Sequence, residues 1–88
     1  MKRVHILIEG KVTGVFFRKY IKFNADKLNI KGWVKNRSNS VEAIFEGEDS
    51  AVNQMIMLCK KGPDYAEVKN INLKEEIPKN EKTFKIIR

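Results

Sequence analysis

The chain has 88 residues, of which 42% are hydrophobic, and its 18 lysine and arginine residues against 11 acidic residues give a formal net charge of +7. This length predicts a single domain over residues 1–88, because two cores would divide too little apolar surface between them. No apolar run approaches the roughly 20 residues of a membrane span, and the first apolar stretch is too short for a signal peptide. We therefore expect a soluble, cytoplasmic protein without a membrane partner. Its charge favours anionic partners, although solubility alone would also explain it.

The first half of the chain predicts a strand, a helix and a hairpin. Residues 4–8 alternate in polarity, which is typical of a strand, here ending at Gly10. The next apolar residues recur at helical spacing and predict a helix that closes near Asn29; they are Phe17, Ile21, Ala25 and Leu28. The segments KGWVKN and VEAIFEG flank the polar turn RSNS, so residues 31–47 predict an antiparallel hairpin.

The second half predicts another helix and two strands. The run EDSAVNQMIMLCKKG has helical periodicity, with Asp49 and Ser50 as candidate N-terminal caps and Gly62 as its end. The runs AEVKNINLKEE and TFKIIR follow as strands. The resulting order predicts an α+β ferredoxin-like sandwich, βαββαβ with an extra C-terminal edge strand, in which two helices cover one face of an antiparallel sheet. This fold serves many functions and identifies none.

The stretch GKVTGVFFR, residues 10–18, joins the first strand to the first helix. Glycines in such a loop allow successive N–H groups to face one way, and a helix N-terminus attracts anions. Arg18, one turn later, adds a planar donor that suits phosphate oxygens. An ordinary glycine turn followed by an arginine in a surface ion pair explains the same residues. We expect Phe17 to begin the buried stripe of the helix and Phe16 to cover the edge of the core.

Two segments resemble the signatures of the acylphosphatases. The first signature reads glycine, any residue, valine, glutamine, glycine, valine, any residue, phenylalanine, arginine, and GKVTGVFFR matches it except at Thr13. The second, glycine, aromatic, small apolar, basic, asparagine, is similar to GWVKN at residues 32–36. The likeness continues through VEAIFEG, the helix end CKKGP and the closing FKI, so it spans nearly the whole chain.

The resemblance implies hydrolysis of acyl phosphates to a carboxylate and inorganic phosphate, without a metal or other cofactor, by a monomer acting on small molecules. It implies that Arg18 and Asn36 are catalytic, with Asn36 orienting the attacking water. It also implies a phosphate site made of the backbone N–H groups of Val12, Thr13, Gly14, Val15, Phe16 and Phe17. Without the resemblance, the preferred interpretation of Asn36 is a turn residue that ends a strand and bonds its own backbone.

The chemistry agrees with these residue types. A carboxylate leaving group, with a conjugate-acid pKa of about 4, departs without a proton from the protein. Phosphoryl transfer needs mainly positioning and hydrogen-bond donors around the phosphate oxygens. Asparagine cannot deprotonate water, so we expect a phosphate oxygen of the substrate to accept the proton.

Three positions depart from the family pattern. Thr13 replaces the glutamine, Arg37 follows Asn36 where a small residue is usual, and the turn after it is one residue shorter and lacks glycine. We expect Asn39 to adopt the left-handed conformation in that turn. These changes bear on the rate, since Arg37 can crowd the water site and a misplacement of about 1 Å matters to catalysis.

The remaining chemistry-bearing residues receive structural interpretations. His5 and Cys59 are the only residues of their types, which is too few for the usual zinc site or a disulfide. We expect His5 to be structural and Cys59 to lie in the core. A nucleic-acid-binding module is disfavoured because the central strands offer only Phe45 for base stacking. A low-activity regulatory or carbamoyl-phosphate-handling domain remains open.

Overall fold

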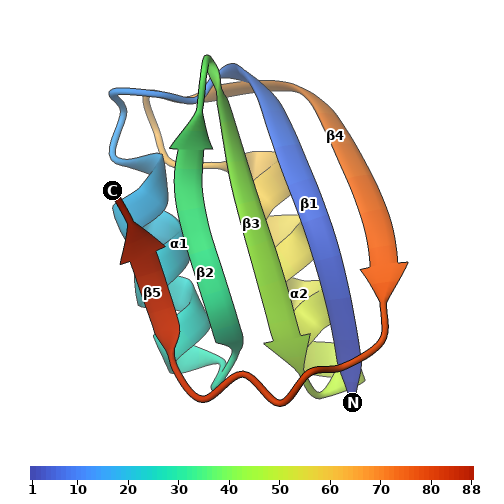
Figure 1. Cartoon of the computed structure of the whole chain (residues 1–88). Coiled ribbons are helices and arrows are strands. Elements are labelled where there is room, and N and C mark those ends of the chain that lie inside the picture. The colour runs from blue at the N-terminus through green and yellow to red at the C-terminus, as the bar shows by residue number, and fades with distance from the viewer.

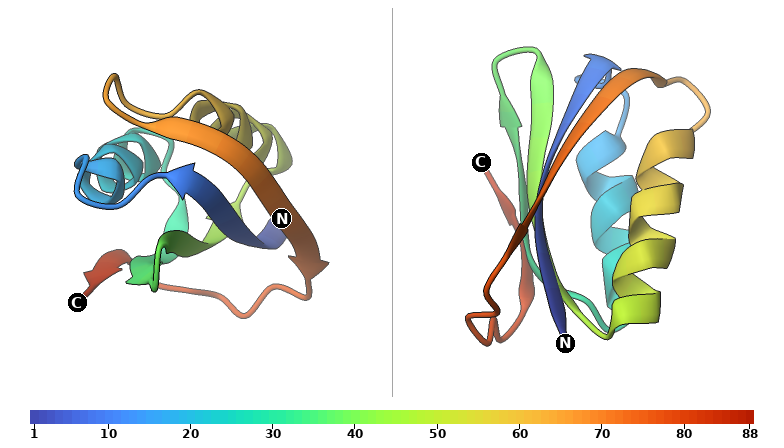
Figure 2. Two further views of the ribbon diagram at one scale, coloured as in Figure 1. Left: turned by 90° about the horizontal axis from the view of Figure 1, so that it is seen from above. Right: turned by 90° about the vertical axis from the view of Figure 1, so that its right-hand side faces the viewer.

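The computed structural model describes residues 1–88, and the chain forms five strands and two helices. They are β1 (Lys2–Lys11), α1 (Phe17–Lys27), β2 (Lys31–Arg37), β3 (Ser40–Gly47), α2 (Asp49–Lys61), β4 (Glu67–Glu76) and β5 (Phe84–Ile87). Both helices pack on the same face of the sheet, as the right-hand view of Figure 2 shows. The predicted ferredoxin-like sandwich is therefore confirmed. Neither helix is long and apolar enough to cross a membrane.

The sheet has the strand order β4-β1-β3-β2-β5. All pairs are antiparallel, as predicted, except that β5 lies parallel to β2. The reason is visible in Figure 1, where residues 77–83 cross one end of the sheet from the β4 edge to the opposite edge. As a result β5 starts at the same end as β2 and runs in the same direction. The extra edge strand therefore makes the sheet mixed.

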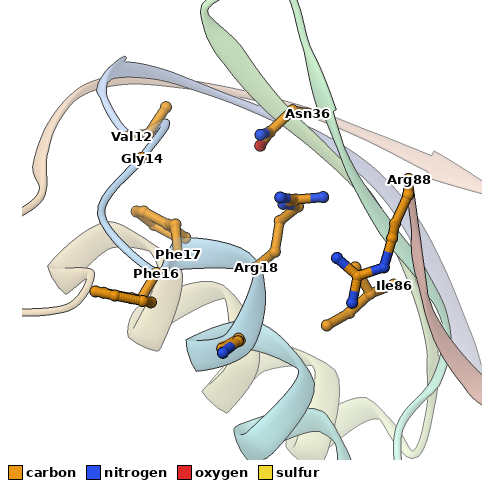
Figure 3. A pocket seen from close by; sticks show the side chains of 9 residues that line it. Val12, Gly14, Phe16, Phe17, Arg18, Asn36, Ile86 and Arg88 are labelled. Carbon is orange, nitrogen blue, oxygen red and sulfur yellow. The ribbon is translucent and has the colours of Figure 1, made fainter.

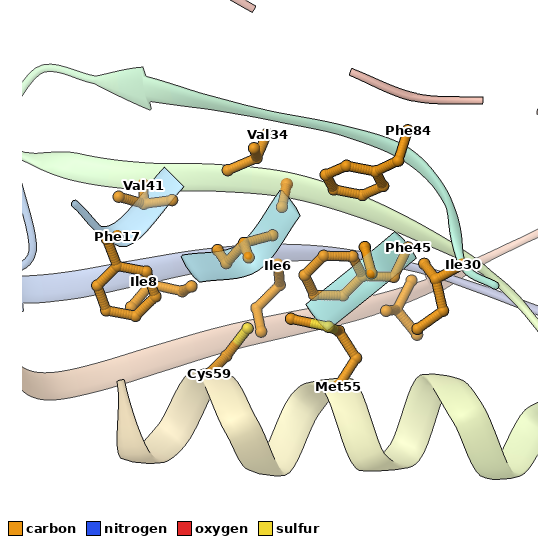
Figure 4. Packing of buried hydrophobic residues seen from close by; sticks show 14 of the residues in the cluster. Ile6, Ile8, Phe17, Ile30, Val34, Val41, Phe45, Met55, Cys59 and Phe84 are labelled. Carbon is orange, nitrogen blue, oxygen red and sulfur yellow. The ribbon is translucent and has the colours of Figure 1, made fainter. Parts of the chain in front are cut away.

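The core lies between the sheet and the helices (Figure 4). Residues of β1, β2, β3 and β5 and one stripe of each helix supply it, as the sequence periodicity predicted. The edge strand β4 contributes only the partly buried Val68 and Ile71, which the sequence alternation places on opposite faces; the register shift between β1 and β4 at Glu9 and Gly10 accounts for this difference. Its largest fully buried side chains include Phe17, Phe45, Ile6, Ile8, Ile21, Ile30 and Met55. Cys59 is fully buried in α2, which confirms its expected place in the core.

Two local details differ from the sequence prediction. The N-cap of α2 is Glu48, in extended conformation and without a side-chain cap, so Asp49 and Ser50 are not caps. They already belong to the first turn, because the chain leaves β3 at Gly47 and enters the helix almost directly. The β2–β3 hairpin has a two-residue loop, and Ser38 rather than Asn39 takes the positive φ of 54°. Tight hairpins need a positive φ at their first central residue.

Candidate active site

A pocket of about 250 Å³ lies where β1 passes into α1, next to the last residues of β2 and β5 (Figure 3). Residues far apart in the chain meet here because these segments end at the same end of the sheet. The pocket is lined by Val12, Gly14, Phe16, Phe17, Arg18, Lys19, Asn36, Ile86 and Arg88. The structure thus brings Arg18 and Asn36, the two residues that the family resemblance identified, together with the loop before α1. The side chains of Thr13 and Val15 lie outside the lining.

The loop before α1 has an alternating backbone. Gly14 and Phe16 have φ of 71° and 62°, while Thr13 and Val15, the residues directly before each of them, keep negative φ. Alternation of this kind turns successive N–H groups toward one side and forms a concave site for anions. None of the N–H groups of residues 12–19 donates a hydrogen bond within the protein. Because these donors stand at the N-terminus of α1, the helix dipole adds to their attraction for an anion.

The two phenylalanines at the start of α1 have opposite surroundings. Phe17 is 2% exposed and meets Tyr20 edge-on, with 5.8 Å between ring centroids, so its expected role as a core anchor is confirmed. Phe16 is 71% exposed and lies on the pocket rim, so the expectation that it covers the core edge is wrong. Its left-handed backbone ends the loop and starts the helix, which turns Phe17, and not Phe16, toward the core.

Arg18 lies in the first turn of α1 and extends toward Asn36 (Figure 3). Its guanidinium makes no hydrogen bond or ion pair with the protein, unlike that of Arg3, which pairs with Glu46, Glu76 and Glu81. Arg18 is therefore not part of a surface ion pair, which was the alternative interpretation of this residue. All its donors remain available to a ligand in the pocket.

Asn36 is the next-to-last residue of β2 and shares the helix-facing side of the strand with Val34. Its amide makes no hydrogen bond to the protein, so it does not bond its own backbone as a turn residue would. Arg37 points to the opposite sheet face, where its Nη1 lies 3.9 Å from Glu42 Oε2. The expected crowding of Asn36 by Arg37 therefore does not occur.

Three lining residues were not identified from the sequence: Lys19, Ile86 and Arg88. The parallel register pairs Lys35 with Ile87, which places Arg88 beside Asn36 on the neighbouring strand. No sequence signal marked Arg88, because its place depends on the direction in which β5 joins the sheet. Lys19 directly follows Arg18 in α1, and because consecutive helical residues do not face each other, no sequence signal marked it either.

The lining is positively charged. It contains the cations Arg18, Lys19 and Arg88, and no carboxylate side chain. It holds no histidine or cysteine either, so no lining side chain is suited to act as a base at neutral pH. A pocket with free backbone donors and only positive side chains can bind a polyanion such as a phosphate group and stabilise negative charge on its oxygens.

Comparisons with known proteins agree with this geometry. The acylphosphatase family model matches residues 4–86. An acylphosphatase of Moorella thermoacetica is 42% identical over 85 residues, which cover 96% of this chain and 91% of that relative. The crystal structure of acylphosphatase from Bacillus subtilis superposes with a TM-score of 0.96 at 32% identity, covering all of both chains.

The same fold also occurs inside a much larger protein. Full-length HypF, in its phosphate- and nucleotide-bound form, contains a region that superposes with a TM-score of 0.93 at 33% identity. That region covers 99% of this chain but only 12% of HypF. Since the family model spans almost all residues and the curated relatives match along most of their own length, the chain belongs to the acylphosphatase family, whose members hydrolyse acyl phosphates.

Proposed function

We propose that this pocket cleaves the carboxyl–phosphate bond of acyl phosphates without a metal, with Arg18 and Asn36 as its catalytic residues. The observation that carries the proposal is the convergence of the unbonded N–H groups of residues 12–17 and the unpaired Arg18 guanidinium on one pocket. A phosphate group has several oxygen acceptors and a negative charge, so it can bind to several N–H donors and a positive guanidinium at once.

The loop and Arg18 hold the phosphate through its transition state. In a loose, in-line phosphoryl transfer, charge spreads over the three equatorial oxygens, and donors fixed around them lower the barrier. The alternating backbone at Gly14 and Phe16 fixes the N–H groups before the substrate arrives. Arg18 adds a two-pronged, permanently charged donor. Preorganisation of this kind costs no rearrangement during the reaction.

The leaving group needs no help from an acid. The bond between the phosphorus and the bridging oxygen breaks, and its electron pair goes to a carboxylate whose conjugate acid has a pKa of about 4. A base this weak departs unprotonated at neutral pH. The lack of a carboxylic acid or histidine side chain in the lining suits this step.

Asn36 positions the nucleophile. Its amide oxygen accepts a hydrogen bond from a water molecule and its NH₂ group donates one, so it can fix the water opposite the departing carboxylate. As the water oxygen bonds to phosphorus, its proton passes to a phosphate oxygen of the substrate. The products are a carboxylate and inorganic phosphate, and no protein group changes its protonation state.

We further propose that the protein acts as a cytoplasmic monomer on small molecules, without a cofactor and without nucleic acid. Phe45, the aromatic residue of the central strands β1 and β3, is buried in the core and is not available for base stacking. The single cysteine is buried as well, which suits a reducing compartment.

Hydrolysis of benzoyl phosphate in the presence of a chelator tests the activity and the site together. Loss of Arg18 or Asn36 by substitution with alanine should lower kcat/KM by about 10²- to 10³-fold, the usual effect of removing one preorganised transition-state donor. Arg37→Ala and Asn39→Ala are matched controls on the same hairpin, outside the pocket lining. An inactive wild type contradicts the activity, and activity that survives both site substitutions contradicts the site.

Binding of the product gives a second measurement. Inorganic phosphate at about 100 times its Kd should stabilise the fold by about 2.7 kcal/mol, since it binds only the folded state. Arg18→Ala should abolish most of this rise in melting temperature, whereas Arg37→Ala should preserve it. An equal rise in both variants would mean that phosphate binds elsewhere on this basic protein.

A further inference from the structure

We infer that Phe16 and Lys19 form the subsite for the acyl group, and that the enzyme prefers acyl phosphates whose acyl group has an aromatic or extended apolar part ending in an anionic group. This inference rests on the proposed function, because the direction of the acyl group follows from the placement of the phosphate and the water.

In-line displacement fixes that direction. The water held by Asn36 attacks phosphorus from the strand side of the pocket, so the bond to the acyl oxygen must point away from Asn36. Phe16 lies on the helix and loop side of the pocket, well separated from Asn36 in Figure 3. Lys19 is at the same side, because its Nζ lies 5.6 Å from the centroid of the Phe16 ring.

Phe16 is placed for contact with a ligand. A bulky side chain at a φ of 62° is a rare and costly backbone state, and here it serves the alternation that orients the N–H groups. The same residue leaves its ring 71% exposed at the pocket rim. A planar or extended apolar group that continues from a phosphate in the loop can cover this ring and remove it from water.

Lys19 supplies the charge preference. It lines the pocket, forms no ion pair with a carboxylate, and holds its ammonium over the Phe16 ring. An acyl group that lies on the ring brings its far end toward this ammonium. A carboxylate or phosphate at that end therefore gains an opposite charge, and a neutral end gains none.

The chain contains a matched control pair. Lys27 Nζ lies 5.6 Å from the ring centroid of Phe23, on the same helix, and Phe23 is 64% exposed. Neither residue lines the pocket. Removal of this second pair changes the exposed aromatic area and the net charge of α1 in the same way, but leaves the pocket intact.

The first test compares benzoyl phosphate with acetyl phosphate, whose acyl group is too short to cover the ring. Phe16→Ala should lower the benzoyl-to-acetyl ratio of kcat/KM by about five- to tenfold, the usual worth of an aromatic contact. Phe16→Asn, which tolerates positive φ, should lower it equally, so a backbone effect is separated from loss of the ring. Phe23→Ala should leave the ratio unchanged. An unchanged ratio in both Phe16 variants overturns the aromatic contact.

The second test compares 3- and 4-carboxybenzoyl phosphate with the corresponding carboxamides, which have the same shape and no extra charge. The wild type should prefer at least one carboxylate, and Lys19→Gln should reduce this preference by about threefold, as expected for an exposed ion pair. Lys27→Gln should not reduce it. Absence of the preference, or its equal loss in both variants, overturns the charge preference. Failure to hydrolyse any of the substrates instead contradicts the proposed function itself.

Discussion

Arg3 and Glu46 form a buried ion pair on the sheet face opposite the helices, with 3.6 Å between Nη1 and Oε2 and side chains 5% and 2% exposed. The carboxylate of Glu46 also accepts hydrogen bonds from the backbone N–H groups of Lys79 and Glu81, with 2.6 Å between nitrogen and oxygen in each. These bonds hold the crossing segment 77–83 against the sheet. That segment sets β5 parallel to β2 and so carries Ile86 and Arg88 to the pocket.

Substitution of Glu46 by glutamine should destabilise the fold by about 3 kcal/mol, as is typical when one partner of a buried ion pair is removed. A glutamine oxygen can accept one of the two N–H groups, but its NH₂ group then faces the other donor and Arg3 without a partner. Urea unfolding measures the loss. Glu75→Gln, at an exposed carboxylate without an ion pair, should change the free energy of unfolding by less than about 0.5 kcal/mol. Equal effects would show that the buried pair contributes nothing special.

The same cluster predicts loss of stability in acid. Burial alone would raise the pKa of Glu46, but the N–H groups of Lys79 and Glu81 and the charge of Arg3 outweigh it and lower that pKa. The hydrogen bond from Arg3 lowers the pKa of Glu76. Carboxyls with a lowered folded-state pKa stabilise the fold above their unfolded pKa of about 4.3, and this contribution disappears as pH falls through the folded value.

Melting temperature should therefore be nearly flat from about pH 7 to pH 5 and fall steeply below about pH 4. Glu46→Gln should flatten this acid limb, because the variant has one fewer carboxylate to protonate. An acid limb of unchanged steepness in the variant would assign the acid sensitivity to other groups.

The loop before α1 could be predicted from the sequence because its information is local: Gly14 and the helical spacing after Phe17 are contained in one short stretch. The strand that carries Asn36 could be predicted as well, but the role of Asn36 was inferred from the family resemblance, because the residue alone is more typical of a turn. The position of Arg88 could not be predicted in this way. It depends on a buried cluster between Arg3, Glu46 and the crossing segment, residues that are separated by more than 30 positions in the chain.

Phe16 was misjudged for a related reason. Hydrophobicity predicts burial for both phenylalanines. The alternating sign of φ along the loop decides which of the two faces the core, and no residue pattern in the sequence predicts that alternation. Ser38 is a similar case, since the tight hairpin imposes positive φ by position and not by residue preference. Both errors concern the sign of φ at a turn, which hydrophobicity and residue preference do not specify.

Substitutions of Gly14 test the role of the preorganised loop backbone without changing side-chain packing. A Cβ at this position would meet no atom within 4 Å, so Gly14→Ala changes only the backbone preference at a φ of 71°. The left-handed region costs an ordinary residue about 1–2 kcal/mol, and kcat/KM for benzoyl phosphate should fall about tenfold. Gly14→Asn should retain more activity, because asparagine visits this region more readily. Equal activities of the two variants would rule out the backbone explanation.

Cys59 should be unreactive in the folded protein. Its side chain is fully buried in α2, and burial raises the pKa of its thiol far above the ordinary value, so almost no thiolate forms at neutral pH. Labelling by a thiol reagent should therefore be at least ~10³-fold slower in buffer than in denaturant, since it requires unfolding. Inorganic phosphate should slow it further by stabilising the folded state. Fast labelling in buffer would mean that α2 opens locally.

Arg88 should strengthen the binding of phosphate through its charge. It lines the pocket beside Asn36 and has no acidic partner in the protein. Arg88→Gln should raise the inhibition constant of inorganic phosphate about threefold at low ionic strength, and less at about 0.5 M salt, because salt screens an exposed charge. Lys85→Gln removes the same charge from the opposite face of β5, outside the pocket lining, and should leave the constant nearly unchanged. If both substitutions weakened inhibition equally, the overall positive charge of the protein, and not the position of Arg88, would account for the effect.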